Sequence, residues 1–154
     1  MEKTLVMLKP SAVERNLVGA VISRFEQKGL QLVGVKMLQL DDEILAKHYA
    51  HLVDRPFFQE IKRSMMATPV VACCFEGVDC VRVVRLITGD TNGRNALPGT
   101  VRGDFCVSTQ ENIVHTSDSI ENAAIELSRF FKPEEIFTYK RPNLRFIYTD
   151  DDIE

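Results

Sequence analysis

The order of hydrophobic and polar positions predicts a chain that alternates strands and helices. Residues 4–9, TLVMLK, form a short apolar run that Pro10 ends, which predicts a strand buried on both faces. Over residues 16–28 apolar side chains recur at helical spacing, and Gly29 follows as the kind of residue that ends a helix. Residues 30–40 alternate in hydrophobicity and predict a second strand that is mostly covered.

The middle of the chain predicts three helices and one further strand. Two aspartates at 41–42 can cap a helix that runs to about His51, and the sequence DRPFF predicts a turn into a second helix over 58–66. Residues 70–75 are rich in β-branched and aromatic side chains, which favours a strand. Residues 80–87 predict a third helix, although their β-branched content makes them weaker helix formers.

The last third begins with a long loop and ends with the clearest helical pattern. Residues 89–104 combine glycine, proline and asparagine with no apolar periodicity, and such a long loop in a small domain is usually functional. Residues 113–114 predict a last short strand. The apolar face of the helix that follows is formed by Ile120, Ala123, Ala124, Leu127, Phe130 and Phe131.

This order of elements predicts an α+β domain with the ferredoxin-like βαββαβ plan. The plan is a four-stranded antiparallel sheet with helices on one face. We find no repeat, linker or change of composition, so residues 1–148 are expected to form one domain. Residues 149–154, TDDDIE, form an acidic tail that we expect to be solvated.

Composition excludes several kinds of function. The formal net charge of −3 argues against the overall basic field of a nucleic-acid-binding protein. No apolar run approaches the roughly 20 residues of a membrane-spanning helix, and the N-terminus does not resemble a signal peptide. Cys73, Cys74, Cys80 and Cys106 form no C-x-x-C pair, which predicts free thiols in a reducing, cytoplasmic environment.

Basic residues near the predicted loops suggest a site for a polyphosphate. They are Lys9 at the end of the first strand, Arg55 in DRPFF, Arg85 on the third helix, and Arg94 and Arg102 in the long loop. Arginine makes forked contacts with phosphates, and lysine supplies a point charge. Neither common glycine-rich phosphate loop is present. A chain with 19 lysines and arginines also places several of them near loops without any function.

His115 is the candidate reactive residue. The pattern Asp118-x-x-Glu121 is close to a capping box, so a helix is expected to begin near residues 117–119, just after His115. The positive end of that helix favours an anion and keeps the imidazole neutral and nucleophilic. Glu126 lies two turns along the same helix and can turn back to bond the other ring nitrogen. The alternatives are a packed histidine and a solvated glutamate.

The chain resembles nucleoside diphosphate kinases along nearly its whole length. The matching motifs are MLKPSAVERNLVG, RFEQKGLQLVGVKM, HYAHLVDRPFF, TGDTN, PGTVRGDF and ENIVHTSDSIENAAIEL. The resemblance implies that a nucleoside triphosphate donates its γ-phosphate to His115, and that the phosphohistidine then phosphorylates a nucleoside diphosphate. It also implies Mg²⁺, which we expect to arrive on the nucleotide because the sequence has no carboxylate cluster to hold it.

The resemblance also implies a role for individual residues. Lys9 matches the lysine that reaches the γ-phosphate and the sugar 3′-hydroxyl, and Asn112 matches the asparagine on that hydroxyl. Phe57 matches the residue that stacks on the base, so ATP, GTP, GDP and deoxynucleotides are all expected substrates. The remaining residues match the phosphate-binding set Arg55, Arg85, Thr91 and Arg102, the tyrosine Tyr49 near the γ-phosphate, and the pair Ser117 and Glu126 that orders the histidine.

Several positions depart from the family pattern. Thr116 replaces the usual glycine after the histidine, which strains the backbone if that position needs a positive φ and crowds the mouth of the site if it does not. Gly93 replaces a proline and is expected to loosen a loop that supports oligomer contacts. Ser11 and Ala12 replace an Asp-Gly pair with little expected effect, and Phe146 stands near the place of a missing tryptophan.

Other interpretations remain open from the sequence alone. The chain could be a catalytically impaired nucleotide-binding or scaffold relative, a histidine phosphocarrier for proteins, or a nucleic-acid-binding ferredoxin-like module. His48 and His51 have a spacing that suits a metal on a helix, but no third ligand is evident nearby. The family resemblance implies a homo-oligomer, and the chain length with its C-terminal extension favours a hexamer over a tetramer.

Overall fold

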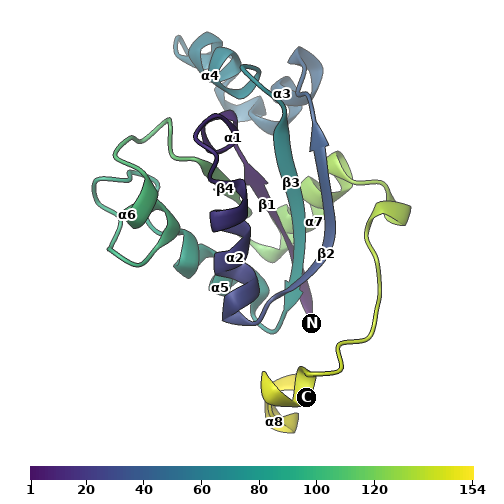
Figure 1. Ribbon diagram of the computed structural model, residues 1–154. Helices are drawn as coiled ribbons and strands as arrows, with labels where there is room; N and C mark the ends of the chain where they lie inside the picture. The colour runs from purple at the N-terminus through teal and green to yellow at the C-terminus, as the bar shows by residue number, and fades with distance from the viewer.

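A four-stranded antiparallel sheet with the order β2-β3-β1-β4 forms the centre of the computed structural model, which describes residues 1–154 (Figure 1). The strands are β1 (Glu2–Leu8), β2 (Gln31–Leu38), β3 (Val70–Gly77) and β4 (Val114–Thr116). β1 pairs with both β3 and β4, and β2 pairs with β3 at the edge. This strand order and direction confirm the predicted ferredoxin-like plan.

Eight α-helices and three short 3₁₀ turns connect the strands. The helices are α1 (Pro10–Glu14), α2 (Val18–Lys28), α3 (Asp42–His48), α4 (Phe58–Met65), α5 (Cys80–Thr88), α6 (Val101–Phe105), α7 (Ile120–Phe130) and α8 (Asp150–Ile153). The 3₁₀ turns are η1 (Ala50–Leu52), η2 (Pro133–Glu135) and η3 (Leu144–Phe146). None of these helices combines the length and the apolar character needed to cross a bilayer.

Helices cover both faces of the sheet, so the prediction of helices on one face is wrong. Val6 and Leu8 of β1 pack in one core with residues of α2 and α5, whereas Leu5 and Met7 pack in a second core with residues of α7. Figure 1 shows α2 and α5 in front of the sheet and α7 behind it. β1 alternates between two apolar environments, which explains why its sequence is a continuous apolar run.

β2 is less covered than its sequence predicts. A bulge between Leu32 and Gly34 shifts the register against β3, so the regular alternation expected over residues 30–40 does not hold. Val33 is buried, but Val35 is 53 % exposed and Met37 is 62 % exposed. β2 is an edge strand, and no helix covers these two side chains within the chain.

Four further differences from the prediction concern helices. α1 was not predicted, and α6 forms within the long loop because the Thr100 side chain caps it by accepting from Gly103 N. α7 begins at Ile120 with Ser119 as its cap, and Ile120 and Ala124 are exposed because Ala123, Leu127 and Phe130 face the core. The acidic tail is exposed as predicted, but it forms α8 behind a capping box at Thr149.

Candidate active site

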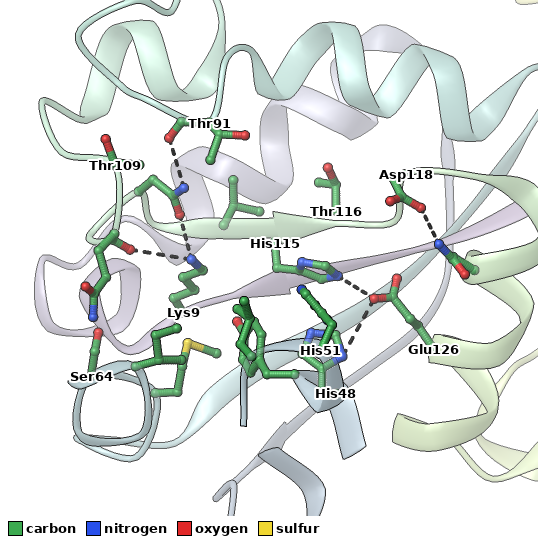
Figure 2. A pocket seen from close by; sticks show the side chains of 18 of the residues that line it. Lys9, His48, His51, Ser64, Thr91, Thr109, His115, Thr116, Asp118 and Glu126 are labelled. Atoms are coloured by element: carbon green, nitrogen blue, oxygen red, sulfur yellow. Dashed lines mark hydrogen bonds and ion pairs between the residues drawn. The ribbon is translucent and has the colours of Figure 1, made fainter. Parts of the chain in front are cut away.

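A cavity of about 670 Å³ opens between the α3–α4 hairpin, the loop that follows α5, and the ends of β4 and α7 (Figure 2). It brings together most of the candidate catalytic and nucleotide-binding residues of the sequence analysis, although they come from distant parts of the chain. Those that line it are Lys9, Tyr49, Phe57, Arg85, Thr91, Arg102, Asn112, His115 and Glu126. Three of the candidate residues, Arg55, Arg94 and Ser117, do not line it.

His115 is held by a carboxylate on the neighbouring helix. β4 places His115 beside Met7 of β1, and the His115 Nε2 atom lies 2.8 Å from Oε2 of Glu126 on α7. The Ser117 hydroxyl donates to the other oxygen, Oε1, at 2.6 Å. Because an ionised carboxylate only accepts, the ring proton sits on Nε2 and the Nδ1 lone pair stays free. Glu126 is therefore not the solvated helix residue of the alternative interpretation.

The environment of Glu126 favours its ionised form. Burial alone acts to raise the pKa of this carboxyl group. The hydrogen bonds from His115 and Ser117, together with the nearby His48, outweigh burial and lower the pKa below its ordinary value. Glu126 is thus an anion at neutral pH, which is the state that orders the imidazole.

A strained turn leads into His115. Ile113 has a φ of +61°, which a β-branched residue rarely adopts, and Val114 N donates back to Asn112 O at 2.8 Å. This turn is why β4 begins at Val114 and not at the predicted residue 113. Backbone strain of this kind persists only where its surroundings enforce it, and here it sits two residues before the candidate nucleophile.

The buried guanidinium of Arg102 encloses that turn. Its Nε donates to Asn112 O at 3.3 Å, its Nη2 to Val114 O at 2.6 Å, and its Nη1 to Gly89 O at 3.1 Å. A guanidinium has five N–H donors, so two remain for an anion in the cavity. Burial is the main cause that lowers the pKa of Arg102 to about 10, so it stays charged at neutral pH.

Lys9 and Asn112 form a hydrogen-bonded pair on the floor of the cavity. Lys9 Nζ donates to Asn112 Oδ1 at 2.7 Å, and Asn112 Nδ2 donates to the Thr91 carbonyl at 3.0 Å. Burial, with the positive charge of Arg102 as the second cause, lowers the pKa of Lys9 to about 8. The ammonium is poorly solvated where it stands, so an incoming anion is strongly favoured beside it.

The mouth of the cavity carries an aromatic ring and further polar groups. Phe57 is 47 % exposed just before α4, and the exposed Arg55 lies two residues earlier. Arg85 donates to the Thr116 carbonyl at 3.5 Å from α5. Burial, followed by the charge of Glu126, raises the pKa of Tyr49 to about 12, so its phenol keeps its proton and can donate.

Comparison with known proteins identifies the family. A model of the nucleoside diphosphate kinase family matches residues 2–136. This chain belongs to the nucleoside diphosphate kinase family. It is 60 % identical over 152 residues to nucleoside diphosphate kinase of Parabacteroides distasonis, covering 99 % of both chains. It is 46 % identical over 147 residues to nucleoside diphosphate kinase A of Rattus norvegicus, covering 96 % of this chain and 97 % of the other.

Solved structures agree with this assignment. The nucleoside diphosphate kinase of Halobacterium salinarum, solved in complex with CDP, superposes with a TM-score of 0.92 at 37 % identity and covers 96 % of this chain and 99 % of its own. A family protein from Babesia bovis gives 0.92 at 38 % identity, covering 96 % and 100 %. As a member of the nucleoside diphosphate kinase family, the chain is a phosphotransferase.

Thr116 does not strain the backbone of the nucleoside diphosphate kinase site. It pairs with Val6 in β4 and has no positive φ. Because neighbouring strand residues point to opposite faces, its side chain turns away from His115 and is buried (Figure 2), although Thr116 still forms part of the cavity lining. The Thr116 Oγ1 atom has no hydrogen-bond partner.

Gly93 lies where two backbone segments approach closely, and the expected loosening of its loop stays a prediction. Its N–H donates to the Ser108 carbonyl at 3.1 Å, a bond that the proline of the family pattern lacks the hydrogen to make. A Cβ at this position would approach the Cys106 carbonyl oxygen to 2.4 Å. The close approach of two backbone segments therefore requires glycine in this chain.

Two residues belong to the site although the sequence predicted no role for them beside His115. The buried ring of His48 stands edge-on to His115 with 4.6 Å between ring centroids, and Arg129 Nη1 lies 3.0 Å from His48 Nδ1. The sequence indicated only a possible metal spacing for His48 with His51, and no pattern pointed to Arg129. Helical spacing was the available hint. Residues three or four positions apart lie on the same side of a helix, as Glu126 and Arg129 do on α7.

The cavity offers little to a metal ion by itself. Asp118 and Glu126 are the carboxylates that line it, and Glu126 is already bonded to His115 and Ser117. One atom each of His48, His115 and Glu126 lie within 4.8 Å of one another, but Arg129 occupies the His48 Nδ1 lone pair. His51, the other histidine of the sequence pair, is not part of this group. Mg²⁺ prefers oxygen ligands, and the protein supplies no cluster of them here.

Proposed function

We propose that this chain transfers the γ-phosphate of a nucleoside triphosphate to a nucleoside diphosphate through a phosphohistidine on His115. The observation that carries the proposal is the Glu126–His115 hydrogen bond of 2.8 Å, supported by Ser117. The Nδ1 lone pair attacks the γ-phosphorus, the bond to the bridging oxygen breaks, and its electron pair leaves with the diphosphate. A second diphosphate then attacks the phosphohistidine with a terminal oxygen and regenerates the ring.

The cationic residues of the cavity suit the phosphates. Lys9 and Arg102 stand nearest the floor, and their charges favour the anion and its transition state. We assign Arg85, Thr91 and Arg55 to the remaining phosphate oxygens, with Arg55 moving in from its exposed position when a nucleotide binds. Asn112 is assigned to the sugar hydroxyl beside Lys9, and Tyr49 donates near the γ-phosphate.

Phe57 is assigned to the base. Its half-exposed ring at the mouth presents a π-face, which every base can stack on. Purines and pyrimidines, with ribose or deoxyribose, are therefore proposed as substrates, including ATP, GTP, GDP and deoxynucleoside diphosphates. The CDP complex of the Halobacterium salinarum relative supports nucleotide binding in this fold.

Mg²⁺ is proposed to enter with the nucleotide. The lack of a free carboxylate cluster fits an ion held mainly by phosphate oxygens and water. When bound, Mg²⁺ neutralises part of the phosphate charge. The remaining charge of the phosphates would be met by the cations Lys9, Arg85 and Arg102.

A cytoplasmic homo-oligomer is proposed, with a hexamer favoured over a tetramer. Exposed apolar side chains support contacts between copies, notably Val35 and Met37 on the edge strand and Phe137 after η2. Four free, buried cysteines support a reducing compartment. Residues 1–148 are proposed as the kinase domain, with 149–154 as an accessory tail.

The first experiment is intact mass measurement after brief exposure to ATP and Mg²⁺. We expect one phosphate adduct on the wild type, its loss on addition of GDP, and no adduct on a His115→Ala variant. An adduct that persists in His115→Ala would place the phosphate elsewhere. A wild type that binds nucleotide but forms no adduct would contradict the proposed transfer and indicate a catalytically impaired relative.

A further inference from the structure

Arg129 makes a contact that the transfer mechanism above does not use. It lies three residues after Glu126 on α7, on the same side of the helix, and its Nη1 atom is 3.0 Å from Nδ1 of His48. A guanidinium can only donate, so His48 Nδ1 must accept. The neutral His48 ring therefore carries its proton on Nε2.

The protonation state of His48 affects the bond that orders His115. His48 Nδ1 lies 3.6 Å from Glu126 Oε2, the same oxygen that lies 2.8 Å from His115 Nε2. A proton on His48 Nδ1 would turn that nitrogen into a donor to Oε2. The two histidines would then share one carboxylate oxygen, which would weaken the bond that keeps His115 Nδ1 unprotonated.

The surroundings of His48 oppose that proton. Its ring is almost fully buried and packs edge-on against His115, Tyr49 and Phe130. The ionisable groups around it are Glu126 and Arg129 from α7, His115 from β4, Lys9 at the end of β1, and the neighbouring phenol of Tyr49. Burial and the proximity of His115 lower the pKa of His48 to about 3, and only Glu126 acts in the opposite direction.

We propose that Arg129 is a positioning residue for phosphoryl transfer, which acts through His48. By occupying the His48 Nδ1 lone pair, Arg129 reserves Glu126 Oε2 for His115 Nε2–H and so keeps His115 Nδ1 free to attack phosphorus. The inference rests on the proposed function of His115. It adds Arg129 and His48 to Glu126 and Ser117 as residues that order the His115 ring. Arg129 lines the cavity, but its hydrogen bond is to His48 and not to His115.

The test compares Arg129→Met with wild type in two backgrounds. We expect the rate of phosphohistidine formation at saturating ATP and Mg²⁺ to fall about tenfold, similar to the loss when metal-ligating histidines lose their hydrogen-bond partners. The loss should be similar near pH 6 and pH 8, because the neutral His48 ring can move its proton from Nε2 to Nδ1 without a change of charge. Arg129→Lys, which retains a cationic donor, should restore most of the rate.

A His48→Phe background separates positioning from other roles. Phenylalanine keeps a ring in the packed site but offers no nitrogen, so Arg129→Met should cause no further loss there. Equal losses in both backgrounds would overturn the proposal, because Arg129 would then act without His48. A loss of nucleotide affinity with an unchanged rate at saturation would also overturn it and would assign Arg129 to phosphate binding.

Nitrogen NMR of the free protein supplies a readout that does not need activity. We expect the wild-type His48 ring to carry its proton on Nε2, and Arg129→Met to shift it toward Nδ1; an unchanged ring would contradict the proposal. Arg82→Met is the matched control, since it removes an exposed α5 arginine that pairs only with Asp79. If the wild type forms no phosphohistidine, the proposed function fails, whereas the NMR result tests the Arg129–His48 contact by itself.

Discussion

The guanidinium of Arg102 bonds the backbone on both sides of Ile113, the buried residue with a positive φ that precedes the histidine strand. A residue that the family pattern assigns to phosphate thus also holds the geometry of the nucleophile. The two roles are compatible, because the bonds to carbonyls use only part of the guanidinium.

Arg102→Met should therefore lower the free energy of unfolding as well as the rate of phosphate transfer. It leaves the carbonyls of Gly89, Asn112 and Val114 without these donors, and at about 1 kcal/mol or more for each the free energy of unfolding should fall by roughly 3 kcal/mol. Chemical denaturation without nucleotide measures this change. Arg85→Met, which removes one long contact to Thr116 O, should cost much less. Equal stability of Arg102→Met and wild type would mean that the three bonds contribute nothing net.

Substitution of the neighbouring residues Phe57 and Phe58 should affect different properties, because only Phe57 lines the cavity. Phe57→Ala should weaken nucleotide binding by about 1–3 kcal/mol for all bases while leaving stability nearly unchanged, because the ring is half exposed. Phe58 is only 6 % exposed, so Phe58→Ala should lower the free energy of unfolding by about 3–5 kcal/mol. Titration calorimetry with several diphosphates and thermal unfolding of both variants make the comparison. A Phe57→Ala defect limited to one base would contradict simple stacking.

We expect the Thr116 hydroxyl to lower the free energy of unfolding without affecting phosphate transfer. Thr116→Val keeps the β-branched shape and removes a buried hydroxyl that has no partner, so the free energy of unfolding should rise by about 1 kcal/mol with transfer unchanged. Thr116→Gly, which restores the family residue, should lower it by about 1 kcal/mol because glycine weakens a strand. Thr4→Val, with the same unpartnered atom in β1, is the matched control. A loss of transfer in Thr116→Val would assign a role to the hydroxyl.

The sequence was most informative where a single local pattern decides the structure. The continuous apolar run of β1, the helical spacing of α7 and the motif around His115 were all predicted. Glu126 lies within hydrogen-bond distance of the imidazole, and Ser117 donates to Glu126. Helix periodicity alone misjudged Ile120, which is exposed because α7 turns its Glu126 side toward β4.

The features that were not predicted depend on contacts between distant segments. The β2 bulge is visible only in its register against β3. The positive φ of Ile113 persists because Arg102, on another element, holds the carbonyls around it. Arg129 has no special neighbours in the sequence, and it becomes part of the site only because α3 brings His48 within 3.0 Å. Each of these needs tertiary structure to define it.

Lys9 should give the site an alkaline limit near pH 8. Its pKa falls from the ordinary 10.5 to about 8 in the folded chain, and only the ammonium form attracts phosphate. The rate constant kcat/KM, which reports the free enzyme, should decline as pH rises through that value. In kcat the limit should lie at higher pH, since bound phosphate stabilises the ammonium. Lys9→Arg should move the limit in kcat/KM to higher pH, because arginine stays charged.

The contribution of Lys9 to the free energy of unfolding should rise over the pH range in which kcat/KM falls. A loss of activity caused by Lys9 titration can therefore be distinguished from unfolding. Between pH 8 and 10.5 the unfolded chain holds the Lys9 proton more often than the folded chain does, so the contribution of Lys9 to the free energy of unfolding rises with pH. The buried thiols of Cys73, Cys74 and Cys80, whose pKa values burial raises to about 12, act the other way. The difference between wild type and Lys9→Met cancels them and should rise across this window. A difference that stays flat while kcat/KM falls would mean that another group sets the alkaline limit.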